Sequence, residues 1–209
     1  MTHSALIHKI QELRENISSV YMGNAMAIDR VVISLLAKGH ILIEDVPGVG
    51  KTVLASAVAK SVGGSFARIQ CTPDLLPSDI TGINMFNRTS SDFTFQPGPI
   101  FNNIVVADEI NRTTPRTQSS LLEAMSEGAV TIDGDTKPLP SPFMVIATQN
   151  PYEFEGTYFL PENQLDRFLM RINLGYPSPN DEHRVIKQQP AQTTLQTLQP
   201  IMSTEEIVG

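Results

Sequence analysis

Short apolar runs alternate with segments of helically spaced apolar residues along most of this chain. Recurrence every three or four positions predicts amphipathic helices, and short apolar runs bounded by turn residues predict strands. Strands that alternate with helices favour an α/β fold, with a five-stranded parallel sheet between helices. The predicted helices are 5–19, 25–37, 53–61, 117–127, 165–170 and 181–187, with a short helical turn at 74–80. The predicted strands are 40–44, 65–70, 104–107, 143–148 and 172–174.

Two further segments have the pattern of β-hairpins inserted into this α/β core. Residues 82–99 place apolar and aromatic positions on both sides of a polar turn. Residues 130–139 place Asp133-Gly134-Asp135, a combination typical of tight hairpin turns, between two short strand-like stretches. The sequence therefore predicts two inserted β-hairpins.

Composition and charge indicate a folded, acidic protein. Of its 209 residues, 41% are hydrophobic and 18% are charged, which is typical of a globular chain. The net charge of −7 argues against a nucleic-acid-binding surface and against anionic membranes. Cys71 is the single cysteine, so no internal disulfide can form, which fits a reducing compartment. No apolar run approaches the roughly 18–20 residues of a membrane span, so we expect a cytoplasmic protein.

A glycine-bearing turn between the strand at 40–44 and the helix at 53–61 is the first chemical signature. Backbone N–H groups of such a loop bind phosphate, the Lys51 side chain reaches the β- and γ-phosphates, and the Thr52 hydroxyl binds Mg²⁺. Asp45 stands where the strict motif has its first glycine. The turn predicts a nucleoside triphosphate site with Mg²⁺. Its expected binding residues are Pro47, Gly48, Val49, Gly50, Lys51 and Thr52.

Two carboxylates directly follow the apolar strand at 104–107. Asp108 is expected to hold Mg²⁺ together with Thr52, because Mg²⁺ prefers oxygen ligands and keeps much of its water. Glu109 can orient the water that attacks the γ-phosphate, or accept its proton. Adjacent carboxylates at the end of a buried strand are costly unless a metal or water satisfies them, which favours a functional pair.

Asn150 and Arg167 each allow two interpretations on spacing alone. Asn150 follows the strand at 143–148 and could hold the attacking water, or simply cap the next turn. Arg167 could reach the γ-phosphate of a neighbouring subunit as an arginine finger. It could equally form a surface ion pair with Asp166 or Glu162.

Taken together, the motifs resemble those of the MoxR family of AAA+ ATPases, in the order and spacing of that family from about residue 20 to 177. The resemblance implies that Lys51 and Thr52 are the Walker A pair and that Asp108 and Glu109 are the Walker B pair. The segments that carry it are 39–52, 96–101, 107–112, 118–125, 146–151, 155–157, 160–162 and 165–168.

The same resemblance assigns three further residues. It makes Asn150 the sensor 1 residue and Arg167 the arginine finger, acting on the site of the next subunit. Gly23 falls beside the adenine, whereas Asn24 departs from the glutamine usual in the family. The two hairpins are similar to elements that line the central pore or face of a ring and are candidates to contact client proteins, although their sequences equally allow surface decoration.

The resemblance also implies a domain organisation and partners. We expect an AAA+ nucleotide-binding domain at 1–177, followed at 178–209 by a linker and the start of an incomplete C-terminal lid. ATP and Mg²⁺ are the implied cofactors. The implied assembly is a homo-oligomeric ring, a hexamer, that remodels or matures client proteins, including partners with von Willebrand factor A domains.

Other functions stay open at this point. A nucleotide-dependent switch or scaffold with little turnover fits the incomplete lid. A DNA-directed motor is disfavoured by the acidic balance and by hairpins in which Arg88 and Lys137 stand alone. A GTPase is disfavoured because no Asn-Lys-x-Asp sequence follows the phosphate loop.

Overall fold

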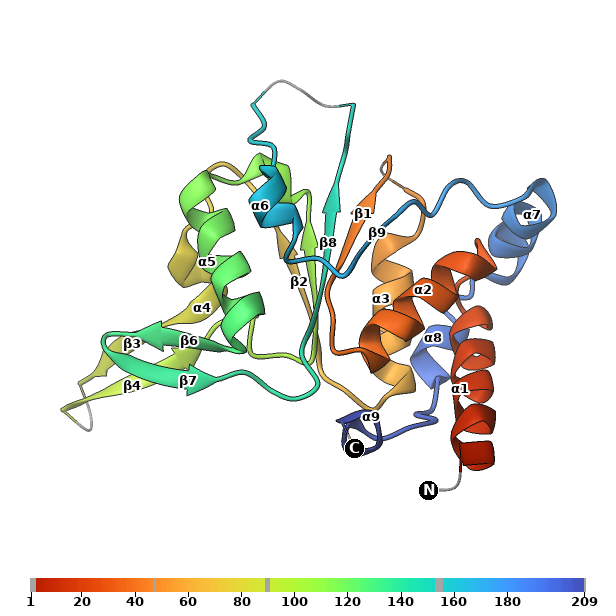
Figure 1. Cartoon of the computed structure of the whole chain (residues 1–209), viewed down its shortest axis with the longest axis horizontal. Coiled ribbons are helices and arrows are strands. Elements are labelled where there is room, and N and C mark those ends of the chain that lie inside the picture. The colour runs from red at the N-terminus through yellow and green to blue at the C-terminus, as the bar shows by residue number, and fades with distance from the viewer. Residues whose placement is uncertain (1–2, 47, 89–90, 153–155, 209) are drawn as a thin grey trace.

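A five-stranded parallel sheet is the centre of the structure, a computed structural model that describes residues 3–46, 48–88, 91–152 and 156–208 (Figure 1). Its strand order is β2-β5-β8-β1-β9, and all four pairings are parallel. The predicted α/β class and five-stranded parallel sheet are confirmed. The strands are β1 Ile41–Glu44, β2 Phe66–Gln70, β5 Ile104–Asp108, β8 Met144–Gln149 and β9 Met170–Ile172.

Helices cover both faces of the sheet because alternate strand residues point to opposite sides. Ile41 and Ile43 join an apolar cluster with α1, α2 and α3, whereas Leu42 joins a second cluster with α4 and α5. All three strand residues are fully buried. Helices α1 His3–Ser18, α2 Ala25–Leu36 and α3 Lys51–Ser61 lie on the first face, and α4 Pro77–Thr81, the 3-10 turn η1 Ile110–Arg112 and α5 Pro115–Glu127 lie on the second.

Both predicted hairpins are present, and Figure 1 shows them together on the side of α4 and α5. The Asn84 side chain joins them by donating a hydrogen bond to Asp133 Oδ2 over 2.8 Å. Phe86 and Phe93 form an edge-to-face pair across the first hairpin and remain more than half exposed. The turn of that hairpin includes residues 89–90, which lie outside the described residues. The strands are β3 Gly82–Asn87, β4 Asp92–Pro97, β6 Ala129–Ile132 and β7 Asp135–Pro138.

The predicted helix at 165–170 is wrong. Helix α6 spans only Glu162–Leu165, and the chain then enters β9, two residues earlier than the predicted strand at 172–174. Phe168 and Leu165 form a single turn, in which the Phe168 N–H donates to Leu165 O. Both side chains pack against the second cluster, which explains their helical spacing in the sequence. Pairing of Met170 with Ile41 then imposes strand geometry on the backbone.

The C-terminal segment contains three helices, of which only the first was predicted. Helices α7 Pro179–Gln188, α8 Thr194–Thr197 and α9 Thr204–Val208 follow one another after the sheet. Met202 and Ile207 are buried in the cluster with α1–α3, and Ile201 N–H donates to Ser61 O over 2.8 Å. The division into domains at residue 177 stays a prediction. Within the described ranges, no helix is long and apolar enough to cross a membrane.

Candidate nucleotide site

The loop between β1 and α3 has the backbone that phosphate binding requires. Gly48 and Gly50 adopt left-handed conformations, with φ angles of 90° and 86°. Residues with a Cβ rarely adopt these angles, which explains both glycines. Val49, between them, is 5% exposed. Pro47, the remaining predicted loop residue, lies outside the described residues.

Lys51 begins α3 and points back across the loop. Its side chain is buried, and Nζ donates a hydrogen bond to the backbone oxygen of Asp45 over 2.7 Å. Burial lowers the pKa of Lys51, while the nearby charges of Asp108, Asp45 and Glu109 act in the opposite direction. The ammonium group therefore lies in a recess where carboxylates favour its charged form.

Asp108 ends β5 and is held by two side chains from the neighbouring strands. The Thr148 hydroxyl of β8 donates to Asp108 Oδ1 over 2.6 Å, and Arg68 Nη2 of β2 donates to Oδ2 over 2.5 Å. Thr148 is fully buried, so its hydroxyl fixes the carboxylate in one orientation. The same hydroxyl accepts the Glu109 N–H over 2.9 Å, which positions the next residue as well.

Glu109 has a left-handed backbone with φ of 58°, which turns its side chain away from the strand direction. Its Oε2 accepts hydrogen bonds from Arg112 over 3.0 Å and from Gln70 over 3.3 Å. Arg68 and Gln70 were not predicted to belong to the site. The sequence carries no signal for them, because only the pairing of β2 with β5 brings these alternate polar residues of β2 to the carboxylates.

A polar cavity of about 380 Å³ joins the loop to both carboxylates. The structure thus brings together Lys51, Thr52, Asp108 and Glu109, as predicted from separate motifs. Thr52 and Asp108 present hydroxyl and carboxylate oxygens to the same cavity, a donor set that suits Mg²⁺. The lining residues are Gly48, Gly50, Lys51, Thr52, Val53, Arg68, Gln70, Asp108 and Glu109.

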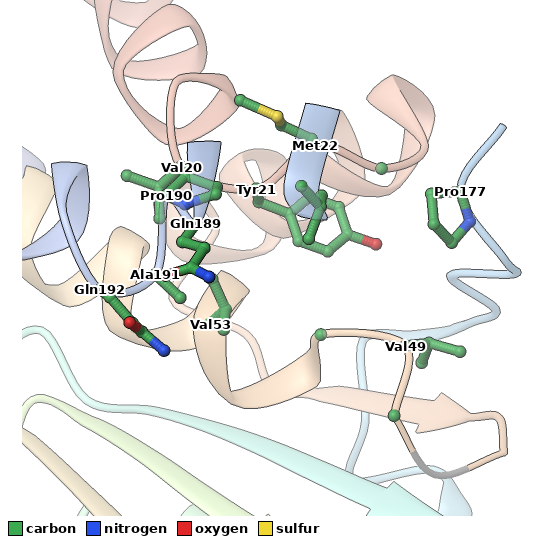
Figure 2. Close-up of a pocket in the computed structure, with 14 residues that line it drawn as sticks. Val20, Tyr21, Met22, Val49, Val53, Pro177, Gln189, Pro190, Ala191 and Gln192 are labelled. Atoms are coloured by element: carbon green, nitrogen blue, oxygen red, sulfur yellow. The ribbon is translucent and has the colours of Figure 1, made fainter. Parts of the chain in front are cut away.

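A second cavity of about 290 Å³ shares three lining residues with the first and is lined largely by apolar side chains (Figure 2). Gly48, Gly50 and Val53 line both cavities, so a ligand with a polar and an apolar end can bridge them. The other lining residues come from 20–23, Val49, Pro177, Val185 and 189–192.

Gly23 lines the second cavity, and the Tyr21 ring leaves no room for a side chain at this position. A Cβ at Gly23 would lie 2.5 Å from the Tyr21 ring, and one at Gly50 would lie 3.2 Å from it. Burial, and secondarily the charge of Asp45, raises the pKa of Tyr21 to about 12. Tyr21 therefore stays neutral and forms an ordered wall between the two glycines.

Asn150 and Arg167 line neither of these two cavities. Asn150 follows β8, and its Oδ1 accepts the Tyr152 N–H over 3.2 Å, as a turn cap would. Arg167 is exposed and donates to the Ser126 hydroxyl of α5. β9 runs parallel to β1 and begins after Arg167. This residue therefore lies toward the amino ends of the strands, whereas the phosphate loop follows the carboxyl end of β1. The structure therefore does not bring Arg167 to its own nucleotide site.

Comparisons with known proteins show which family this chain belongs to. The sequence model of the ATPase family associated with various cellular activities (AAA) matches residues 40–170. The chain belongs to this family. Relatives named MoxR, described next, place it among the MoxR-type AAA+ ATPases.

Three relatives and one solved structure illustrate the match. The uncharacterized protein YeaC of Bacillus subtilis (strain 168) is 55% identical over 194 residues, which cover 93% of this chain and 61% of YeaC. Chaperone MoxR1 of Mycobacterium tuberculosis is 47% identical, covering 88% of this chain and 48% of MoxR1. Protein MoxR of Methylorubrum extorquens is 32% identical, covering 77% of this chain and 48% of that protein. The crystal structure of a proposed ATPase from Cytophaga hutchinsonii has a TM-score of 0.87 and 43% identity, covering 96% of this chain and 61% of that one.

The chain thus spans about half to three fifths of the length of these relatives.

Proposed function

We propose that this chain binds ATP with Mg²⁺ across the two neighbouring cavities and hydrolyses it to ADP and phosphate. The observation that carries the proposal is the meeting of four predicted residues around one cavity, which shares part of its lining with a more apolar one. The polar cavity suits the phosphates and the apolar cavity suits the base. Lys51, Thr52, Asp108 and Glu109 are the residues in question.

Each of these residues has a separate task in the reaction. Lys51 leaves the Asp45 carbonyl and pairs with the phosphates, and the loop N–H groups bind the remaining oxygens. Thr52 and Asp108 would hold Mg²⁺, which would supply positive charge that stabilises the phosphates. Glu109 accepts a proton from the attacking water as the water oxygen bonds to the γ-phosphorus and the bond to ADP breaks.

Completion of the site requires a second copy of the chain. Arg167 is remote from its own phosphate loop yet exposed, which fits a residue that stabilises the transition state in a neighbouring subunit. Asn150, at the carboxyl end of β8, is assigned to holding the attacking water. We therefore propose a homo-oligomeric ring, a hexamer, with each ATP between two subunits.

The proposed role of the ring is to remodel or mature client proteins. A relative named as a chaperone supports this role. The two hairpins, with Phe86 and Phe93 exposed, are the proposed client contacts. A partner with a von Willebrand factor A domain and a cytoplasmic location belong to the same proposal, which the family resemblance supports.

A nucleotide-dependent switch with little turnover is the second candidate. Arg68 and Arg112 hold the two carboxylates, Asp108 and Glu109, in ion pairs that both have to rearrange before metal binding and proton transfer. If these pairs persist when ATP is bound, the chain binds nucleotide without turning it over. Such a chain would act through its bound and free conformations.

The deciding experiment measures phosphate release per subunit over a wide range of protein concentration. The proposal predicts that specific activity rises with concentration, because each active site needs Arg167 of a second copy. A flat, nonzero specific activity contradicts the shared site. ATP binding without phosphate release at any concentration favours the switch.

A further inference from the structure

Asp45 occupies the position where the strict phosphate-loop motif has its first glycine, and both of its carboxylate oxygens accept hydrogen bonds. Oδ1 accepts the N–H of Val46 over 2.9 Å. Oδ2 accepts two N–H groups from the segment after β9, Leu174 over 2.9 Å and Gly175 over 2.7 Å. Hydrogen bonds to a carboxylate are stronger than those between neutral groups. A glycine could form none of them.

The same residue contacts the other end of the loop through its backbone. The Asp45 carbonyl accepts the Lys51 ammonium over 2.7 Å, and that ammonium has to move when phosphate binds. Asp45 therefore touches both the group that senses phosphate and the segment that leads to α7. Pro177 and Val185 of that segment and helix line the apolar cavity.

We propose that Asp45 is a positioning residue that couples phosphate binding in the loop to the segment at 174–188. When phosphate draws Lys51 away from the Asp45 carbonyl and stabilises residues 48–53, the carboxylate of Asp45 holds Leu174 and Gly175 beside the loop. Helix α7 is then fixed beside the apolar cavity by the phosphates, before any contact with the base. This inference rests on the proposed ATP site and deepens it.

The rival explanation is that Asp45 merely fastens two neighbouring strands together. Such fastenings exist nearby, since Arg171 pairs with Glu44 Oε2 over 3.0 Å and Asn173 donates to the Glu44 carbonyl over 2.5 Å. Both contacts are made to Glu44, the last residue of β1, from Arg171 in β9 and from Asn173 directly after it, and neither reaches the loop. Asp45 differs because its carboxylate accepts the N–H of Val46 on the loop as well as those of Leu174 and Gly175.

The test uses a ligand without a base, because a base would contact α7 directly. Amide hydrogen exchange is measured for the intact chain with Mg²⁺ and tripolyphosphate, and separately with Mg²⁺ and ADP. Tripolyphosphate is expected to slow exchange at 48–53, which reports loop binding. It is also expected to slow exchange at 174–188 by about tenfold, although it touches neither segment 177–178 nor α7.

Asp45→Gly restores the strict motif and removes the carboxylate. We expect tripolyphosphate still to protect 48–53 in this variant but no longer to protect 174–188. Asp45→Asn keeps the volume and one acceptor oxygen, so it tests the same loss if Asp45→Gly does not fold. Arg171→Gln, which breaks a strand fastening only, is expected to keep the full response.

Three results overturn the inference. One is protection of 174–188 by ADP but not by tripolyphosphate, which would mean that contact with the base, and not phosphate binding, fixes this segment. Another is a response of full size in both Asp45 variants. The third is its equal loss in Arg171→Gln. If neither ligand protects 48–53 in the unchanged chain, the proposed ATP site itself is wrong, and the inference fails with it.

Discussion

At the scale of single residues, the site is a set of charged groups that are already paired. Lys51 holds a backbone carbonyl, Asp108 holds Thr148 and Arg68, and Glu109 holds Arg112 and Gln70. Burying unpaired charges costs several kcal/mol. These pairs therefore stabilise the charged groups, and the proposed binding exchanges them for phosphate, metal and water.

Glu109→Gln separates binding from catalysis. The amide preserves size and the left-handed backbone, but it cannot accept the proton of the attacking water. We expect ATP affinity within about threefold of the unchanged chain and turnover lower by at least about 100-fold. Titration with a fluorescent ATP analogue and phosphate release measure the two quantities.

Glu123→Gln is the matched control, because Glu123 is an exposed residue of α5 outside both nucleotide cavities. It should leave binding and turnover unchanged. Turnover by Glu109→Gln equal to that of the unchanged chain would remove Glu109 from its assigned role.

Gly23→Ala tests the apolar cavity as the base site. The new Cβ would lie 2.5 Å from the Tyr21 ring, which is buried and has to move. Overpacking of this kind costs about 1–3 kcal/mol, so ATP affinity is expected to fall by about tenfold or more. Tripolyphosphate affinity, measured by calorimetry, is expected to fall less, because the Lys51 side chain is untouched and the loop is affected only through the Tyr21 ring near Gly50. Equal losses for both ligands would place the base elsewhere.

The residue scale also shows why part of the site could be predicted from the sequence. Lys51 and Thr52 adjoin their glycines, and Asp108 adjoins Glu109, so local order alone identifies them. Thr148 and Arg68 meet Asp108 only because β8 and β2 flank β5. Nothing within either strand indicates that neighbour, so these partners required the structure.

At the scale of elements, His40, which directly precedes β1, connects β1 to β8 and α5. Its Nδ1 accepts the Val145 N–H over 3.0 Å, and its Nε2 donates to the Met125 carbonyl over 3.0 Å. This arrangement requires the neutral ring, because a protonated Nδ1 could not accept. Burial lowers the pKa of His40, and the bond to Met125 opposes that shift only in part.

Stability is therefore expected to depend on pH through His40. In the unfolded chain the ring takes up a proton near its ordinary pKa of about 6.5, while the folded ring resists it until lower pH. The stability that the neutral ring contributes is fully present above the ordinary pKa of about 6.5 and is lost as the pH falls from there toward the lower pKa of the folded state. The slope for one proton is at most about 1.4 kcal/mol per pH unit.

Urea unfolding between pH 7.5 and 5 measures this dependence. His40→Gln should be less stable at pH 7.5, because its contacts to β8 and α5 are weakened, and should show a shallower decline toward pH 5. Parallel declines in the two proteins would show that His40 is not the source.

Elements also differ in how well their patterns could be interpreted. Asp133 and Gly134 are residues that strongly favour a tight hairpin turn, and this hairpin was predicted correctly. Segment 165–170 had helical spacing, but pairing with β1 made its end a strand. Helix α9 was missed because its five residues bury one large apolar side chain, Ile207, too few for a periodic pattern.

At the scale of the whole molecule, the separation of Arg167 from the phosphate loop predicts a site shared between copies. Lys51→Ala removes phosphate binding but keeps a donor arginine, whereas Arg167→Ala keeps an intact loop but lacks the finger. Each variant alone is expected to have less than about a tenth of normal turnover. Mixed subunits create interfaces in which an intact loop faces an intact Arg167.

Random mixing in equal amounts makes about a quarter of the interfaces complete, so turnover should recover toward about a quarter of the normal value. Phosphate release measured before and after mixing gives the answer, and the mean of the two separate activities is the baseline. A mixture that never rises above this baseline argues that sites are not shared. Recovery, by contrast, requires that the loop of one copy and the arginine of another act together, which no single chain with Arg167 beyond the opposite edge of its sheet can achieve.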